Sequence, residues 1–199
     1  HRVRRVQLIV PLSLWRLVKA KHAAGAFDGE GARRFGGRWN ERGTAVVYLG
    51  GTLSLAALET FVHLTAADAR LAFVAIEVIV PDGVRITELT QSRLARNWRA
   101  EPPPPETQAI GSEWTRSGET LLLRVPSVIV PREENYLLNP AHEEFPRLKI
   151  RPREKIGQRP TMLGSFDEGT WIVGDPAFAD QECKELPKRR QGARGTGGA

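Results

Sequence analysis

The chain has 199 residues, enough for one full domain with a tail but too few for two large domains. A hydrophobic fraction of 41% supports a packed core, and the net charge of +6 is spread out rather than gathered in a basic arm. This charge would help to attract an acidic ligand or partner. Zinc-finger spacing, RNA-recognition aromatic motifs and a basic zipper are all missing, so we expect no direct nucleic-acid binding.

Cysteine and histidine are scarce. The single cysteine, Cys183, excludes a disulfide within the chain and favours a reducing compartment. The four histidines and this cysteine show no metal-ligand spacing, so we expect no metal. No run reaches the roughly 18–20 apolar residues of a membrane span, and no signal peptide is recognisable. The sequence therefore predicts a cytoplasmic protein without membrane contact.

The first half of the chain alternates apolar runs with glycine-rich segments. Runs of apolar and β-branched residues predict strands at residues 12–18, 45–49, 71–80 and 84–87. The third strand is almost continuously apolar and should be buried on both faces, and the fourth should return after a turn. Residues 22–43 contain too many breakers for regular structure, so we expect a functional loop. Residues 54–64 have the apolar spacing of a helix.

The second half is divided by prolines. Residues 91–99 predict a short helix, and Pro102–Pro105 a polyproline-like connector. A helix at residues 110–116 should end at Gly118.

A strand at residues 121–130 follows, and Pro126 requires it to lie at a sheet edge or a bulge. Residues 135–146 are loop-like, and residues 148–150 should close the sheet. Residues 151–199 have the composition of a poorly structured tail, in which Trp171–Val173 could add a strand.

Glu59 is the unusual residue of the predicted helix at residues 54–64. It lies on the flank of an apolar stripe, beside Leu55 and Val62. A carboxylate near apolar surface is costly unless it is paired or hydrogen-bonded. Glu59 is either an edge residue that reaches water or an arginine, or a site carboxylate that faces Arg38.

Arg38 lies in the densest cluster of glycine and polar residues, Gly36–Asn40. The planar fork of a guanidinium donates two parallel hydrogen bonds to an oxyanion, which suits a phosphate-bearing ligand. The alternative is an ion pair with Glu41 or another acid.

These features together resemble the RES-domain family, the toxin half of a bacterial toxin–antitoxin pair. The family is named after a recurring arginine, glutamate and serine. The resemblance covers roughly residues 12–150. The motifs that carry it are Trp15-Arg16, Gly36–Asn40, Val47-Tyr48, Ala57–Glu59 with Val62-His63, Gly111–Trp114, Val125–Ser127, and Asn135–Pro140 with His142.

The resemblance implies catalytic roles for Arg38, Glu59 and Ser127, with Tyr48 and Arg16 in substrate binding. Glu59 would stabilise positive charge on a ribose, and Arg38 would bind the diphosphate or position a phosphate. Tyr48 would present its ring to a base, and Ser127 would donate a hydrogen bond to the ligand. We do not expect Ser127 to act as a nucleophile.

Each of these residues also has a structural alternative. Tyr48 could be a half-buried strand aromatic, and Ser127 only a hydrogen-bonded bulge residue. We expect Asn135, Asn139 and His142 to fix a loop through backbone hydrogen bonds rather than to take part in chemistry. The tryptophans Trp15, Trp39 and Trp114 should pack in the core or line a cleft.

The fold that the resemblance implies is α+β and ADP-ribosyltransferase-like. It would be a single domain at residues 12–150, with a mixed or antiparallel twisted β-core, followed by the tail at 151–199. NAD would be a substrate rather than a cofactor, with inorganic phosphate as a candidate co-substrate. The partner would be a helix-turn-helix (Xre-like) antitoxin, with a homodimer in the complex.

The activity implied is depletion of NAD by phosphorolysis or hydrolysis of the nicotinamide–ribosyl bond. The alternatives are ADP-ribose transfer to a protein, or an inactive remnant that binds only its antitoxin. The residues after Ile150 depart from the usual family ending, and the chain starts at His1 rather than at methionine. An incomplete gene product is therefore one expectation.

Overall fold

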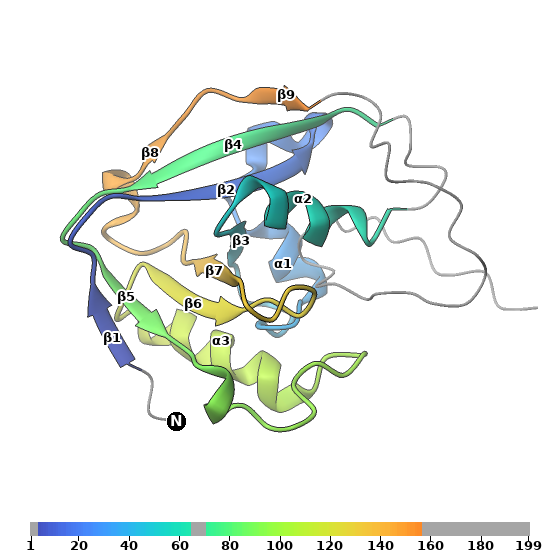
Figure 1. Ribbon diagram of the computed structural model, residues 1–199, viewed down its shortest axis with the longest axis vertical. Coiled ribbons are helices and arrows are strands. Elements are labelled where there is room, and N and C mark those ends of the chain that lie inside the picture. The colour runs from blue at the N-terminus through green and yellow to red at the C-terminus, as the bar shows by residue number, and fades with distance from the viewer. Residues whose placement is uncertain (1–3, 65–70, 157–199) are drawn as a thin grey trace, which may run out of the picture.

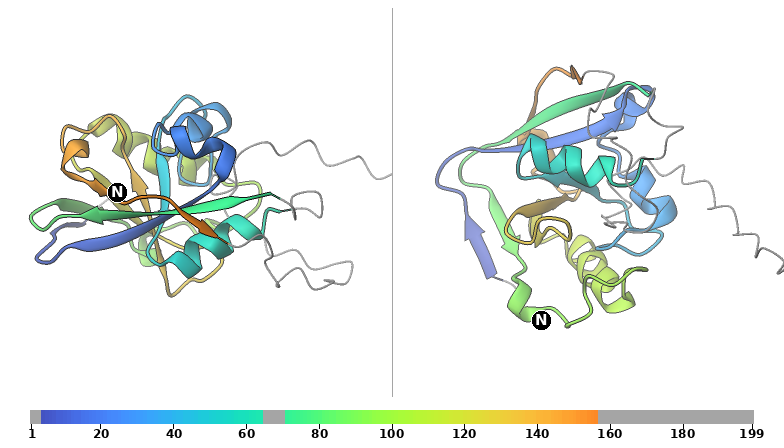
Figure 2. Two further views of the ribbon diagram at one scale, coloured as in Figure 1. Left: turned by 90° about the horizontal axis from the view of Figure 1, so that it is seen from above. Right: turned by 45° about the vertical axis from the view of Figure 1, so that its right-hand side comes forward.

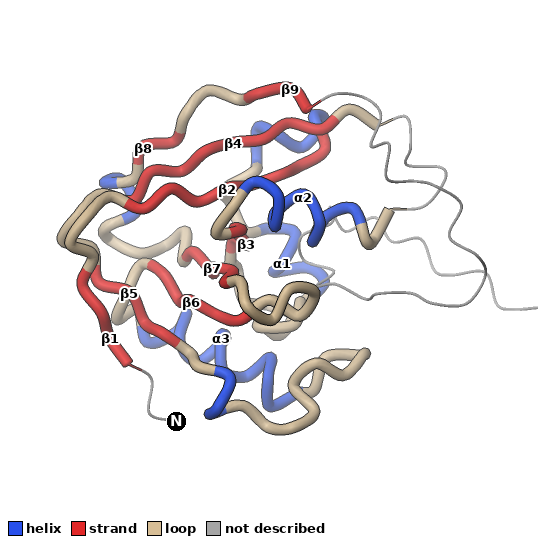
Figure 3. The backbone as a smooth tube through the Cα atoms, in the orientation of Figure 1, coloured by secondary structure: helices blue, strands red, loops and turns tan. Residues whose placement is uncertain are grey.

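The computed structural model describes residues 4–64 and 71–156. These residues form an α+β fold around a twisted, mostly antiparallel sheet of nine strands, as predicted (Figures 1 and 3). The strand order is β1-β5-β6-β7-β3-β2-β4-β8, and β9 also pairs with β4. The strands are β1 Arg4–Gln7, β2 Leu12–Lys19, β3 Val47–Gly50, β4 Phe73–Val80, β5 Arg85–Glu88, β6 Leu122–Pro126, β7 Glu134–Leu138, β8 Lys149–Ile150 and β9 Glu154–Ile156.

The sheet has two arms that meet at one residue pair. Strands β2 and β4 pair along eight residues, and β3, β7 and β6 form a second antiparallel group. Between the arms, β2 and β3 share only the pair Trp15 and Gly50. At Gly50 an added Cβ would lie 2.7 Å from the backbone nitrogen of Ala56, so the glycine lets the following helix approach the junction. The narrow junction places α2 beside both arms.

Three α-helices and short 3₁₀ turns cover the described sheet. They are α1 Glu30–Phe35, α2 Leu53–Phe61, α3 Pro105–Ser117, η1 Ala20–Gly25, η3 Gln91–Arg93 and η4 Phe145–Arg147. The side chain of Thr52 caps α2 by accepting a hydrogen bond from the backbone N–H of Leu55. Figure 2 shows α2 and η1 on opposite sides of the β2–β4 arm. Helix α2 buries Leu55 and Ala56, and Ala56 packs with Leu17 and Ala75.

Helix α3 packs against the second arm. Its residue Trp114 belongs to a buried cluster that includes Trp39, Trp98 and Leu137. At Gly111 an added Cβ would lie 1.8 Å from the carbonyl oxygen of Trp39, so only glycine permits this approach. This contact fixes the Gly36–Asn40 segment against α3.

Several sequence predictions are confirmed. Strands form at β2, β3, β4 and β5, and Gly118 ends α3 in the left-handed region at φ 60°. Helix α2 follows the Gly50-Gly51 turn. Strand β4 is buried along most of its length, and β8 covers part of the predicted closing strand at residues 148–150.

Other predictions for residues up to 99 are wrong. Residues 22–43 contain most of η1 and all of α1, which the surrounding glycines hid. Strand β5 does not return along β4 but pairs with β1 and β6 in the other arm. Residues 91–99 form the short 3₁₀ turn η3 and a second turn at residues 96–99 rather than one helix, and β1 was not predicted.

Two corrections concern strands β6 and β7. Residues 135–146 were expected to be a loop, but β7 runs between β6 and β3, because Tyr136, Leu137 and Leu138 fill the interior of the sheet. Strand β6 lies inside the sheet rather than at its edge, and its pairing with β7 runs regularly through Pro126. Pro126 ends β6, beyond the last residue pair with β5, where the missing N–H breaks no bond of that parallel ladder.

The described fold begins before the predicted boundary and extends beyond it. Strand β1 pairs with β5, and β9 pairs with β4 at residues 73–75. The predicted strand at Trp171–Val173 and most of the predicted tail lie outside the described residues. Within the described part of the chain, no helix has the length and apolar character needed to cross a membrane.

Candidate functional site

Glu59 lies at the centre of a buried polar cluster, which we call the Glu59 cluster: Glu59, Ser127 and Asn135. The hydroxyl of Ser127 and the side-chain amide of Asn135 each donate a hydrogen bond of 2.7 Å to Oε1 of Glu59. Glu59 and Ser127 have no exposed surface, and Asn135 is 3% exposed. The cluster joins α2, the loop after β6 and the start of β7. Glu59 is therefore not an edge residue that reaches water.

Ser127 is held by a tight turn after Pro126. Its hydroxyl oxygen accepts hydrogen bonds from the backbone N–H groups of Ile129 and Val130, at 3.1 and 2.9 Å. A hydroxyl has one proton and two lone pairs, so the donation to Glu59 together with these two accepted bonds uses its whole hydrogen-bonding capacity. In this structure Ser127 orients Glu59, and it has no proton left for a ligand.

Asn135 was not predicted as a site residue. The expectation of backbone contacts is correct for Asn139 and His142 but wrong for Asn135, whose amide binds the side chain of Glu59. The register places Asn135 opposite Val125 and Gly50, so its position depends on three strands. The signal in the sequence was an asparagine before an apolar run, which is not specific.

Arg38 is also fully buried, and its described contacts go to residues 98–101. One terminal nitrogen donates to the carbonyl oxygens of Trp98 and Ala100, at 2.8 and 2.9 Å. The other is 3.1 Å from a carboxylate oxygen of Glu101. Among the described contacts, the acid beside Arg38 is thus Glu101, whereas Glu41 lies 3.8 Å from Arg116.

Tyr48 is 1% exposed, and its hydroxyl binds the residues that follow Arg38. Its hydroxyl donates to the side chain of Asn40 at 2.8 Å and accepts from the backbone N–H of Trp39 at 3.1 Å. The amide of Asn40 in turn donates to three backbone carbonyls. Tyr48 is therefore more deeply buried than the half-buried alternative, and its hydroxyl positions protein groups.

Arg16 lies on β2 and is partly buried. Its guanidinium donates to the backbone carbonyl of Tyr48 at 3.1 Å, which links the two arms of the sheet near their junction. The contact places Arg16 next to a predicted site residue, and its role in substrate binding stays a prediction.

Glu134 precedes Asn135 and is half-buried. Burial raises the pKa of its carboxyl group, against the opposing effect of Arg124, whereas Glu88 raises it further. The neighbouring Tyr136 has its pKa raised by burial too. Strand β7, which supplies Asn135, thus begins with a carboxyl group whose ionisation burial disfavours.

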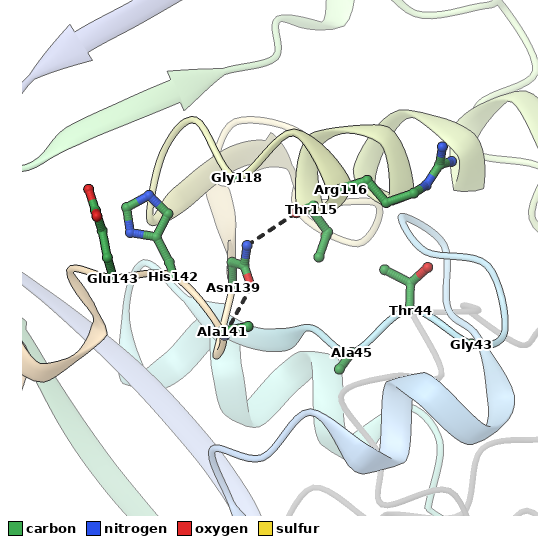
Figure 4. Close-up of a pocket in the computed structure, with 10 residues that line it drawn as sticks. All are labelled: Gly43, Thr44, Ala45, Thr115, Arg116, Gly118, Asn139, Ala141, His142 and Glu143. Atoms are coloured by element: carbon green, nitrogen blue, oxygen red, sulfur yellow. Dashed lines mark hydrogen bonds between the residues drawn. The ribbon is translucent and has the colours of Figure 1, made fainter.

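A separate pocket of about 570 Å³ lies near the end of α3 (Figure 4). It is lined by Gly43, Thr44, Ala45, Thr115, Arg116, Gly118, Asn139, Ala141, His142 and Glu143, so it shares no residue with the predicted site. Asn139 donates to the Thr115 carbonyl and accepts from the Ala141 N–H. No group of three His, Cys, Asp or Glu side chains in the described residues is arranged to hold a metal ion.

Comparison with known proteins identifies the family of this chain. The family model described as "RES domain" matches residues 13–159. The chain belongs to the RES-domain family. The assignment of Arg38, Glu59 and Ser127 as site residues stays a prediction, and the structure joins the last two by a direct hydrogen bond.

Curated relatives match most of their own length. A protein of Yersinia enterocolitica named "Toxin Res" is 40% identical over 134 residues, which cover 67% of this chain and 88% of the relative. A protein of Sphingobium sp. named "Prs ADP-ribosylating toxin" is 41% identical over 155 residues, covering 76% and 96%. Another "Toxin Res", from Pseudomonas putida, is 34% identical over 140 residues, covering 69% and 91%.

A solved structure has the same fold. It is the M. tuberculosis MbcT–MbcA toxin–antitoxin complex, with a TM-score of 0.59 and 20% identity to this chain. The match covers 76% of this chain and 87% of the other. At this identity the likeness concerns the fold alone.

Proposed function

We propose that this RES-domain protein is the toxin of a toxin–antitoxin pair and that it cleaves the nicotinamide–ribosyl bond of NAD. Membership of the family and the names of the curated relatives support the toxin role. The observation that carries the proposed chemistry is Glu59, a carboxylate without exposed surface that two side-chain donors hold in one orientation.

The proposed chemistry follows from the charge that develops as the bond breaks. Departure of nicotinamide leaves positive charge on the ribose, and a fixed carboxylate stabilises it without reorganising during the reaction. Ser127 and Asn135 act on Glu59 and fix its direction. Water or inorganic phosphate then takes the place of nicotinamide on the same ribose carbon.

Arg38 remains our candidate for the diphosphate of NAD. Its guanidinium has the geometry for an oxyanion, but in this structure it holds residues 98–101. Binding of a diphosphate would require Glu101 to give way. Because Glu59, Arg38 and Ser127 have no exposed surface, NAD must displace the groups that cover them.

The test is to incubate the protein with NAD, with and without inorganic phosphate, and to follow nicotinamide release and the ribosyl product. Release that depends on phosphate indicates a phosphorylase, and release without phosphate indicates a hydrolase. Glu59→Gln keeps the shape of the side chain and should lower kcat by about 10²–10³-fold. Folded protein that releases no nicotinamide in either buffer would overturn NAD cleavage by the isolated chain.

A second candidate function is ADP-ribose transfer to a protein. The observation that favours it is the 41% identity to the relative named "Prs ADP-ribosylating toxin". NAD labelled in its adenylate part distinguishes the two functions, because transfer leaves the label on a defined protein acceptor. Depletion leaves it on small molecules only.

The proposed partner is a helix-turn-helix antitoxin that blocks the site. Co-expression with the protein encoded beside this chain should suppress NAD loss and yield a stable complex. If the chain is an inactive remnant, Glu59→Gln will leave any cellular phenotype unchanged and the complex will still form.

A further inference from the structure

The side chain of Asn135 has one buried polar atom without a hydrogen-bond partner. The carbonyl oxygen Oδ1 is shielded from solvent and has no hydrogen-bond partner in the structure. A buried acceptor without a donor costs about 1–3 kcal/mol, so such groups are rare in folded proteins. The other end of the same amide is well used, because Nδ2 donates to Glu59 at 2.7 Å.

Glu59 determines the orientation of this amide. Oε1 of Glu59 accepts the proton of the Ser127 hydroxyl and is therefore an acceptor, so Nδ2 must face it and Oδ1 must point elsewhere. Rotating the amide would place two acceptor oxygens against each other. The unsatisfied acceptor is therefore a consequence of holding Glu59.

We propose that Asn135 is a substrate-binding residue whose Oδ1 accepts a hydrogen bond from a hydroxyl of the nicotinamide ribose. The inference rests on the proposed NAD chemistry and assigns the group that Asn135 recognises. The two ends of an amide are neighbours, so a donor bound at Oδ1 lies beside the sugar carbon that Glu59 would stabilise. A ribose hydroxyl is a donor at that place, whereas the ionised diphosphate of NAD offers only acceptors.

Asn135 would thus select for ribose. A site built to hydrogen-bond a hydroxyl rejects the analogue that lacks it, because the buried acceptor then stays unsatisfied. Asn139 provides a contrast within the same chain, since its amide oxygen accepts from Ala141 and its amide nitrogen donates to Thr115. Both ends of its amide thus have a backbone partner, and its oxygen is not left unsatisfied.

The experiment compares NAD with two analogues that lack the 2′- or the 3′-hydroxyl of the nicotinamide ribose. Wild-type protein should cleave one of them about 10- to 100-fold less efficiently than NAD, measured as kcat/KM. Asn135→Leu should lower activity and remove most of this preference. Asn135→Ala, which adds no bulk, replaces it if the leucine variant does not fold.

Two control variants separate ribose recognition from general damage. Ser127→Ala removes the hydroxyl donor to Glu59 but keeps Oδ1 of Asn135, so kcat should fall while the preference for the hydroxyl stays. Asn139→Leu removes a buried asparagine with a structural role, and it should also keep the preference. Equal preference in wild type and Asn135→Leu would overturn the inference.

Calorimetric binding distinguishes this inference from the proposed function. Glu59→Gln is titrated with NAD and with both analogues, alone and combined with Asn135→Leu. Binding that depends on the hydroxyl through Asn135, without cleavage by wild type, supports the inference and overturns the proposed function. Cleavage by wild type without this dependence supports the proposed function and overturns the inference. Absence of both binding and cleavage overturns both proposals.

Discussion

Glu59 and Arg38 are both charged side chains without exposed surface, yet the protein holds them in different ways. The described hydrogen bonds of Glu59 come from the side chains of Ser127 and Asn135. Those of Arg38 go to two backbone carbonyls and to the half-exposed carboxylate of Glu101. Side-chain donors orient a carboxylate, whereas carbonyl acceptors make the guanidinium a cross-link between distant parts of the backbone. In the described contacts, Arg38 therefore binds the backbone of a distant segment directly, whereas Glu59 joins α2 to residues 127 and 135 through side chains.

Arg38→Met should give the larger loss of stability. It leaves the carbonyls of Trp98 and Ala100 and the carboxylate of Glu101 without their partner, at a cost of about 2–4 kcal/mol. Denaturant unfolding measures the difference in the free energy of unfolding. Glu59→Gln is the matched comparison, because the carbonyl of glutamine accepts the same two hydrogen bonds and the loss should stay within about 1 kcal/mol. Equal free energies of unfolding for the two variants would contradict the view that Arg38 contributes more to the stability of the fold than Glu59 does.

Glu101→Gln tests whether Arg38 binds the substrate in addition to its protein partners. The ion pair is 3.1 Å long, but the Glu101 side chain is 40% exposed, so stability should fall by less than about 1 kcal/mol. If the guanidinium also binds the diphosphate of NAD, the glutamate competes with the substrate, and its neutralisation should lower KM several-fold. Glu106→Gln, an exposed change on α3, serves as the control. An unchanged or higher KM would indicate that Arg38 keeps its protein partners during binding.

The sequence predicted the elements whose pattern is local. The continuous apolar run of β4, the glycine turn before α2 and the end of α3 at Gly118 depend on neighbouring residues only. Strand β7 was missed because its apolar run has only three residues, between an asparagine and an asparagine–proline turn. It becomes a strand because β6 and β3 pair with it on both sides.

The sequence likewise predicted only part of the candidate site. The family pattern indicated Arg38, Glu59 and Ser127, and helical spacing indicated that Glu59 needs a partner. The pattern did not reveal that Asn135 is one of those partners, because the contact spans 76 residues and depends on the register of β7. Nor did it reveal Glu101 beside Arg38, which requires the segment after η3 to fold back over Gly36–Asn40.

Glu134→Gln should have the smallest effect, and the effect should depend on pH. Burial raises the pKa of Glu134 in the folded protein, so the folded state binds this proton more tightly than the unfolded state does. Ionisation therefore costs stability above the ordinary value of 4.5, increasingly as pH rises towards and through the raised folded value. The substitution removes this cost, which is small, below about 1 kcal/mol, because the residue is only half-buried.

Thermal unfolding of Glu134→Gln and wild type at pH 7 and pH 4 measures the difference. The variant should have the higher Tm at pH 7, and the gap should narrow at pH 4, which lies below the ordinary pKa of 4.5. Glu133→Gln is the adjacent control, since its carboxylate accepts a hydrogen bond from Thr52 that an amide oxygen can also accept. A gap of equal size at both pH values would mean that packing around β7, rather than the charge beside Asn135, causes the gain. The strand that orients Glu59 would then carry no electrostatic strain.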